Sequence, residues 1–331
     1  MIMKKTVLSL ATAAAAFAGA PLVFAAPFNP KDVAADPALL LHLDCDALKS
    51  SSVGQSILTQ PDVKDKLAAL GAIFDFDVTT QLHGLTVYTT EGHPKDGALI
   101  VYADFDPDRL LRLAKAADGF HGVTNGSHVI YSWIDDKKKS KDGDPSRVYG
   151  AIAGQRVVFG QEESHLADAL DVIDGKAPTF AGKKGLPDAE GGESIILEGE
   201  LLKFDFDDAD EKAAIFKKAK AVRLKLSEAG RNMTATVRLE AADDDTATQI
   251  ASIAQGLLAV LKLQTGNPDA TKLANAIAIK QDGRTVGLKI SVPSSELTAD
   301  LGDMIKEGDK KAEEKKAEKH AQNDTPAPEN K

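Results

Sequence analysis

The chain has 331 residues, of which 43% are hydrophobic, with one cysteine and a formal net charge of −10. The acidic balance argues against binding to nucleic acid or to anionic lipid, and the lone Cys45 excludes an internal disulfide. About 280 residues lie between the terminal segments described below, which is enough for a large core and typical of two domains.

Residues 1–25 have the pattern of a secretory signal peptide. Lys4 and Lys5 form its positive end, residues 7–20 are small and apolar, and Val23-Phe24-Ala25 fits a cleavage site. We therefore predict a periplasmic or secreted protein that begins at Ala26, with a charge of −12 once both lysines are lost. The run is too short and alanine-rich for a good membrane anchor. No later stretch is judged long and apolar enough to span a bilayer, so no stable membrane insertion is expected after cleavage.

Residues 26–176 form the first predicted domain. After a first strand at 38–45, Asp46 is expected to cap a short helix at 47–58, and a second short helix ends at Gly71. The clearest unit is a hairpin of strands 83–90 and 98–105 followed by a helix at 107–117. A second hairpin (128–134 with 148–153), a short strand at 156–159 and a helix at 163–173 complete the domain.

Two local signals define that clearest unit. Asp96-Gly97 is expected to supply the positive φ that the hairpin turn needs. Asp106 precedes Pro107, which places a good capping carboxylate before a residue that suits the first helical position.

Residues 177–192 contain prolines and glycines without a periodic pattern and are predicted to be a linker. Residues 193–306 form the second predicted domain, in which the strongest helix begins after Asp243 and has a continuous apolar stripe. That stripe is expected to face the core and consists of Ile250, Ile253, Ala254, Leu257, Leu258 and Leu261. A helix is also predicted at 208–218, and a last one after Ser294. Residues 307–331 are rich in charge and are predicted to be a disordered tail.

Each half therefore has the order strand, helix, hairpin, helix, hairpin, helix. We predict an α+β fold of two similar halves, each an antiparallel sheet with helices on one face. The similarity lies in element order, which indicates an internal repeat.

The Asp-x-Asp stretches raise the possibility of a calcium site. In the stretch Asp104, Asp106 and Asp108, however, Arg109 stands where a calcium loop needs glycine and Lys115 where it needs glutamate. We interpret these aspartates as helix caps. No metal ligand and no cofactor-binding residue is assigned.

No catalytic motif is present, and no catalytic residue is assigned. The histidines lack the spacing of a zinc protease, and there is no nucleophile elbow or phosphate-binding loop. A distributed site made of His83, His121 and His128 stays open as the less favoured alternative. Cys45 is expected to be an inert core residue.

Tyr131 and Trp133 share one face of a predicted strand. Core packing is the default interpretation, and an aromatic platform on an uncovered sheet face is the alternative. Tyr88 and Tyr102 are expected on neighbouring strands.

The segments Leu41–Ser50 with Gly54-Gln55, and Leu82–Tyr88, resemble uncharacterised exported proteins of planctomycetes and verrucomicrobia. The resemblance implies an exported α+β protein and brings no catalytic residue with it, because that family has no established activity.

These observations favour a non-catalytic exported protein that acts in binding or envelope maintenance. Its partner would be another protein or a small molecule. The alternatives are a periplasmic hydrolase with a distributed site, and a carrier of an apolar ligand, which would need a cavity between helices and sheet.

Overall fold

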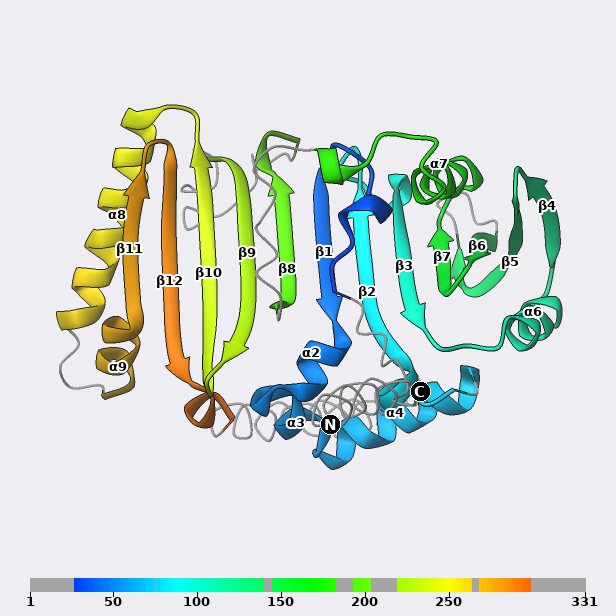
Figure 1. The fold of residues 1–331 in the computed structure, drawn as a ribbon, viewed down its shortest axis with the longest axis horizontal. Coiled ribbons are helices and arrows are strands. Elements are labelled where there is room, and N and C mark those ends of the chain that lie inside the picture. Colours follow the sequence, from blue (N-terminus) through cyan, green and yellow to red (C-terminus); the bar gives the residue numbers. More distant parts are fainter. Residues whose placement is uncertain are drawn as a thin grey trace, which may run out of the picture.

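The computed structural model describes residues 27–74, 76–139, 145–182, 193–203, 219–263 and 268–298. The predicted signal peptide, the tail at 307–331, the helix at 208–218 and most of the last helix lie outside these ranges. Within them the fold is α+β, as the sequence predicts. Its strands form one antiparallel sheet (Figure 1), in the order β11-β12-β10-β9-β8-β1-β2-β3-β7-β6-β5-β4.

The element bounds follow the chain. The strands are β1 (Leu39–Asp44), β2 (Leu82–Thr89), β3 (Gly97–Ala103), β4 (His121–Asn125), β5 (His128–Lys139), β6 (Pro145–Ala153), β7 (Arg156–Gly160), β8 (Glu193–Glu200), β9 (Ala219–Ala229), β10 (Asn232–Ala241), β11 (Ile277–Asp282) and β12 (Thr285–Pro293). The α-helices are α2 (Cys45–Ser50), α3 (Ser52–Leu58), α4 (Pro61–Phe74), α5 (Val78–Gln81), α6 (Pro107–Lys115), α7 (Glu163–Ile173), α8 (Asp244–Leu263) and α9 (Pro268–Ala276). Short 3-10 turns lie at Pro30–Asp32, Pro94–Asp96, Phe180–Gly182 and Leu201–Lys203.

The two halves do not form separate sheets, which corrects the prediction of one sheet in each half. Strand β1 of the first half pairs with β8 of the second, with Leu41 opposite Leu197 and Leu43 opposite Ile195. The pairing satisfies the backbone groups that each half would otherwise present at an open edge. Sequence patterns within each half could not reveal this contact, because it joins residues more than 150 positions apart.

Helices lie on both faces of the sheet, which corrects the prediction that the helices of each half cover one face. Because neighbouring strand residues point to opposite faces, Val158 and Phe159 of β7 mark the two sides. Val158 packs under α7 with Leu40, Tyr88 and Ile100. Following the paired residues outward from Phe159, the opposite face carries Leu99, Val87, Leu41, Leu197, Leu224 and Val237. Leu239, two residues beyond Val237, packs against α8 on that same opposite face.

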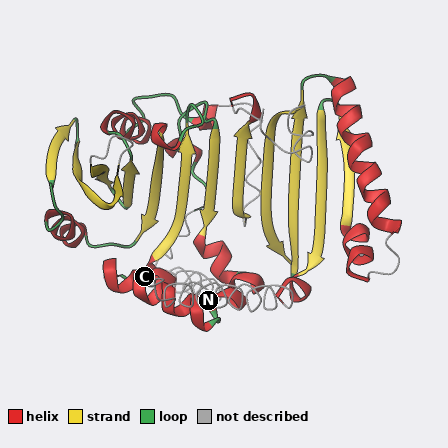
Figure 2. Ribbon diagram, turned by 180° about the vertical axis from the view of Figure 1, so that it is seen from behind, coloured by secondary structure: helices red, strands yellow, loops and turns green. Residues whose placement is uncertain are grey.

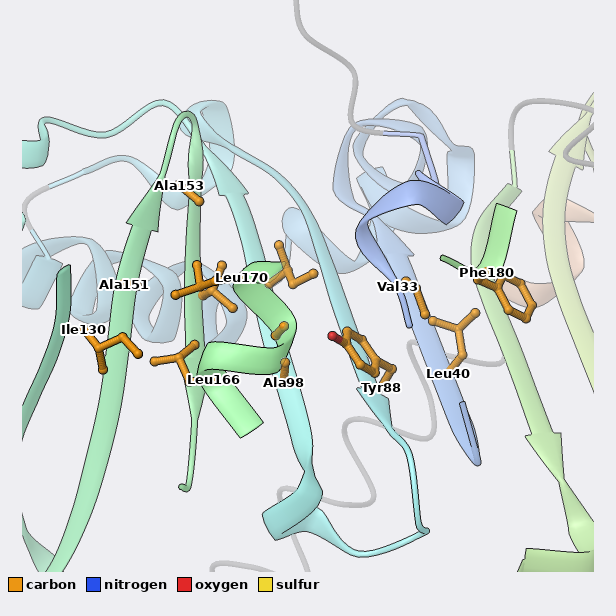
Figure 3. Packing of buried hydrophobic residues seen from close by; sticks show 13 residues of the cluster. Val33, Leu40, Tyr88, Ala98, Ile130, Ala151, Ala153, Leu166, Leu170 and Phe180 are labelled. Atoms are coloured by element: carbon orange, nitrogen blue, oxygen red, sulfur yellow. The ribbon is translucent and has the colours of Figure 1, made fainter. Parts of the chain in front are cut away.

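The larger core lies between α7 and the sheet (Figure 3). Leu166 and Leu170 of α7 are fully buried there, together with Leu40, Ile100 and Phe180. Phe180 belongs to the predicted linker, yet its backbone N–H donates to the carbonyl oxygen of Val33 at 2.8 Å. The first residues of that segment are thus part of the core of the first half, and residues 183–192 are outside the described ranges.

Helix α8 is fully buried only in its N-terminal half, so the predicted inward face is right for Ile250 and wrong for Ile253 and Leu257, which are exposed. Ala247, Ile250 and Ala251 are its buried residues, whereas Leu257 is 65% exposed. The helix runs along the β11 edge of the sheet (Figures 1 and 2), where there is no sheet surface for a wide apolar stripe to cover. By length and composition α8 could cross a membrane, with 17% of its apolar window buried. The prediction that no later stretch is long and apolar enough to span a bilayer was therefore wrong for α8. Whether α8 inserts into a membrane is not tested.

Gly97 is needed for a different reason from the one predicted. Its φ is −113°, and the positive φ of this turn belongs to Gly92, at 89°. A Cβ on Gly97 would lie 2.4 Å from the carbonyl oxygen of Tyr88. Close approach of two backbones, not turn conformation, therefore requires glycine here.

Candidate functional site

A cavity of about 330 Å³ lies between α6 and the face of the sheet opposite α7. Its lining is apolar: no charged side chain is among the described residues around it. The lining consists of Leu110, Leu111, Leu113, Ala114 and Ala117 on the helix side, and Tyr131, Trp133, Gly150, Ala151, Ile152, Val157 and Phe159 on the sheet side. An enclosed engineered apolar cavity of about 150 Å³ stays dry and binds benzene. The space under α6 is larger than that and is partly open to solvent.

Helix α6 is amphipathic but is not packed onto the sheet. The carboxylate of Asp106 caps its start by accepting from the N–H of Asp108 at 3.0 Å and of Arg109 at 3.3 Å. None of its nine residues, all of which the structure describes, is fully buried, and Leu113 is 43% exposed. An apolar helical stripe normally gains its stability by contact with a core. Here the stripe faces empty space.

Aromatic rings and one glycine shape the sheet side of the cavity. Trp133 and Phe159 meet edge to face with ring centroids 6.4 Å apart, and Tyr131 stacks on Phe120 at 5.7 Å. A Cβ on Gly150 would lie 3.2 Å from both Phe159 and Trp133. Any larger residue at this position would push against both rings, so Gly150 lets them sit side by side.

The segments on both sides of α6 are held by hydrogen bonds, to the end of α5 on one side and to the sheet on the other. On the N-terminal side, Asp104 donates its N–H to the carbonyl oxygen of Gln81 at 2.9 Å, and Gln81 Nε2 donates to the carbonyl oxygen of Asp104 at 3.0 Å. On the C-terminal side, Arg147 Nη2 donates to the carbonyl oxygen of Gly119 at 2.6 Å and to Ser132 Oγ at 2.9 Å. Helix α6 therefore spans the cavity and is held by hydrogen bonds on both sides.

A histidine between two carboxylates lies at the N-terminal fastening. His83 Nδ1 is 2.8 Å from Asp46 Oδ2, and Nε2 is 3.0 Å from Asp104 Oδ2. Lys49 Nζ lies 2.7 Å from the other oxygen of Asp46. Burial alone would lower the pKa of His83, but the two carboxylates outweigh it and hold this pKa above its ordinary value.

A second cleft of about 550 Å³, lined in part by charged side chains, adjoins this cluster. Asp32 lies in it and is buried, with Oδ2 accepting from the Tyr102 hydroxyl at 3.0 Å and Oδ1 paired with Arg156. His83 and Asp104 form another part of its wall. The charges lining this cleft are thus largely paired with one another.

The structure does not bring His83, His121 and His128 together. Strands β2 and β5 are four positions apart in the sheet, about 19 Å at the usual strand spacing. His128 instead contacts Asp174 at 2.9 Å, and His121 lies opposite Ser132, at the other end of the β4–β5 ladder from His128. No group of three metal-ligating side chains occurs in the part of the chain that the structure describes.

The capping interpretation holds for part of the aspartates. Asp106 caps α6, and Asp77 caps α5 by accepting from the N–H of Thr79 at 2.8 Å. The first helix is capped by Asp44, which accepts from the N–H of Ala47 at 2.8 Å, and not by Asp46 as predicted. Asp46 and Asp104 pair with His83 instead. The stretch at 204–208 lies outside the described residues.

Cys45 is buried, as predicted, and burial raises the pKa of its thiol to about 11. A thiol held in its protonated form is a poor nucleophile. Tyr88 and Tyr102 lie on the adjacent strands β2 and β3, away from Tyr131 and Trp133 on β5. Neither core packing nor an exposed aromatic platform fully describes Tyr131 and Trp133, because both rings are half-buried and line a cavity.

The cavity itself was missed. The pattern of α6 predicts a helix with one apolar face, and it is silent on whether that face meets side chains or space. The small Ala114 and Ala117 opposite Gly150 are a signal, but only once the sheet order has placed them across from each other.

No protein-family model and no curated protein matches the chain. Among solved structures, it is similar to three crystal forms of TP0453. Form III has a TM-score of 0.43 and 11% identity, covering 83% of this chain and 98% of that one. Forms I and IV have TM-scores of 0.42 and 0.43 with 11% and 9% identity, covering 84% and 85% of this chain and 98% and 99% of theirs. The resemblance to exported planctomycete and verrucomicrobial proteins stays a prediction.

Proposed function

We propose that this chain is an exported, non-catalytic binding protein whose ligand is a small apolar molecule held beneath α6. The observation that carries the proposal is the cavity of about 330 Å³ between an amphipathic helix and an aromatic sheet surface. Ligand sites are typically concave, mostly apolar and a few hundred Å³ in volume. Among the alternatives from the sequence, this one is the carrier of an apolar ligand.

An internal duplication would relate α6 to a helix of the second half that is packed more closely. Outward from the central pair, the strands run β1-β2-β3-β7-β6 on one side and β8-β9-β10-β12-β11 on the other. We infer that the halves are repeats and that α6 corresponds to α8, since each follows the first hairpin of its half. Ala247, Ile250 and Ala251 of α8 are buried against the sheet, whereas α6 stands over a void.

The hydrolase alternative has weaker support. Among the described residues, His83 is the histidine with two carboxylate partners, and its neighbours Asp46, Asp104 and Lys49 include no nucleophilic hydroxyl or reactive thiol. A general base needs a proton to abstract within hydrogen-bond reach.

The chain supplies its own reporter for the test. Trp133 is the single tryptophan and lines the cavity. The uncharged probe N-phenylnaphthylamine should accept energy from Trp133 when bound, and its emission should saturate as it is titrated into the mature protein.

A matched pair of variants locates the binding. Ala114→Phe places a ring in the cavity and should abolish saturable energy transfer, whereas Ala116→Phe adds the same ring at an exposed position of the same segment and should leave it unchanged. If wild type shows no saturable transfer, or if both variants bind as wild type does, the proposal is wrong.

A further inference from the structure

Residues 104–106 connect β3 to α6, and one of the contacts that hold them depends on pH. Asp104 is fastened to Gln81 by two hydrogen bonds that involve no ionisable group. Its carboxylate Oδ2 lies 3.0 Å from His83 Nε2, an ion-pair distance, although Nε2 makes no hydrogen bond by geometry. The hydrogen bond of the ring is made by Nδ1, with Asp46. Protonated imidazole attracts both carboxylates, whereas the neutral ring has no charge and can donate from only one nitrogen. A neutral His83 with its hydrogen bond to Asp46 therefore loses the attraction that holds Asp104.

Space is available for residues 104–106 to move. The cleft of about 550 Å³ adjoins it beside His83 and Tyr102. A second cleft of about 390 Å³ adjoins it on Gln81, Phe105 and Pro107. A segment between two clefts can shift without displacing packed side chains.

The opposite end of α6 is held by contacts that involve no histidine and no carboxylate. The guanidinium of Arg147 donates to the carbonyl oxygen of Gly119 and to Ser132 Oγ. Ile134 also donates its N–H to the Asp118 carbonyl at 2.9 Å. Gly119 itself has a φ of 63°, a conformation that glycine adopts without strain. The contact that depends on the charge of His83 is thus on the N-terminal side of the helix, where it adds to the two hydrogen bonds between Asp104 and Gln81.

We propose that His83 acts as a pH-dependent latch for α6. Its ion pair with Asp104 holds α6 over the apolar cavity at acidic pH and releases the helix as the pH rises. The inference rests on the proposed function for its biological meaning. The charged groups facing His83 are Asp46 and Lys49 from α2 and Asp104 from the end of β3, with Asp32 and Arg156 lining the same cleft. The Asp32–Arg156 pair is complete in itself, so Asp46 and Asp104 are the groups that respond to the charge on His83.

The first test measures release of bound N-phenylnaphthylamine by the loss of energy transfer from Trp133 at about pH 6 and about pH 9. Coupling energies between sites usually correspond to about 5- to 150-fold, so wild-type release should be at least about fivefold faster at the higher pH. His83→Gln and Asp104→Asn should release quickly at both. His121→Gln, an exposed histidine on β4, should behave as wild type.

The second test needs no ligand and separates the latch from the proposed function. Quenching of Trp133 by acrylamide in the free protein should increase over the same pH range in wild type and be high throughout in His83→Gln. Absent probe binding with this quenching pattern would refute the proposed function and support the latch. Saturable binding with release and quenching that do not change with pH, or a His83→Gln variant that keeps the wild-type pH dependence, would overturn the latch.

Discussion

At the scale of single residues, His83 is the group whose surroundings most clearly determine its charge. Both ring nitrogens face carboxylates, at 2.8 and 3.0 Å, and the pKa of His83 is raised in consequence. A raised pKa in the folded state means that folding favours protonation. The stabilisation is therefore complete below the unfolded-state pKa of about 6.5 and is lost as the pH rises through the folded-state value.

The first prediction follows from that sign. His83→Gln should lower the free energy of unfolding more at about pH 5.5 than at about pH 9, because only the protonated ring has the interaction that the variant loses. Urea unfolding of both proteins at each pH measures it. His121→Gln should show no such difference, and an equal loss for His83→Gln at both pH values would contradict the assigned ion pairs.

Gly97 supports the second prediction. Gly97→Ala should destabilise the protein by about 1–3 kcal/mol, because the new methyl group would meet the backbone oxygen of Tyr88. The matched control is Gly256→Ala within α8, where nothing lies within 4 Å of the added carbon. That change should stabilise by about 0.5–1 kcal/mol. Thermal unfolding measures both, and a neutral Gly97→Ala would contradict the close approach.

At the scale of elements, local patterns predicted what is local. The helix at 163–173 has the observed bounds of α7, since its apolar spacing and its stop at Gly175, whose φ is 73°, are all encoded nearby. Strand β4 was not predicted, because its residues are mostly exposed and show no alternation. The inward face of α8 was misjudged because its apolar stripe is longer than the sheet surface available to it.

The third prediction tests that stripe. Ile250→Ala should cost about 2–5 kcal/mol, since Ile250 is fully buried. Leu257→Ala should change stability by no more than about 0.5 kcal/mol, since Leu257 is 65% exposed. Comparing their urea midpoints tests how far along α8 the predicted stripe is packed. A Leu257→Ala variant as costly as Ile250→Ala would mean that the whole predicted stripe faces the core.

At the scale of the whole molecule, the halves are joined by more than the β1–β8 ladder. Ser52 at the start of α3 donates its N–H to Glu228 Oε2 of β9 at 2.6 Å. Lys203 Nζ donates to the carbonyl oxygens of Asp36 and Thr90 at 3.0 and 3.1 Å. These contacts cross from one half to the other, which no pattern within either half could indicate.

The fourth prediction is that the chain unfolds in one cooperative transition. Trp133 reports on the first half, and the far-ultraviolet circular dichroism reports on both, so the two urea curves should coincide. The β1–β8 pairing can be weakened by the double variant Leu41→Ala with Leu197→Ala. This variant should still give coincident curves, at a lower urea midpoint. Two separate transitions in wild type would mean that the halves are independent domains despite their shared sheet.

The cavity beneath α6 is lined by Gly150, by α6 and by strands at one end of the sheet, the end that curls in Figure 1. The exposed stripe of α8 is the competing apolar surface, with Leu257 and Leu263 at 65% and 78% exposure. The most direct measurement is therefore the pattern of nuclear Overhauser contacts between bound N-phenylnaphthylamine and the methyl groups of labelled protein. Contacts with Leu110, Ile152 and Val157 are the predicted result. Contacts with Leu257 and Leu263, and none with the cavity residues, would contradict the account.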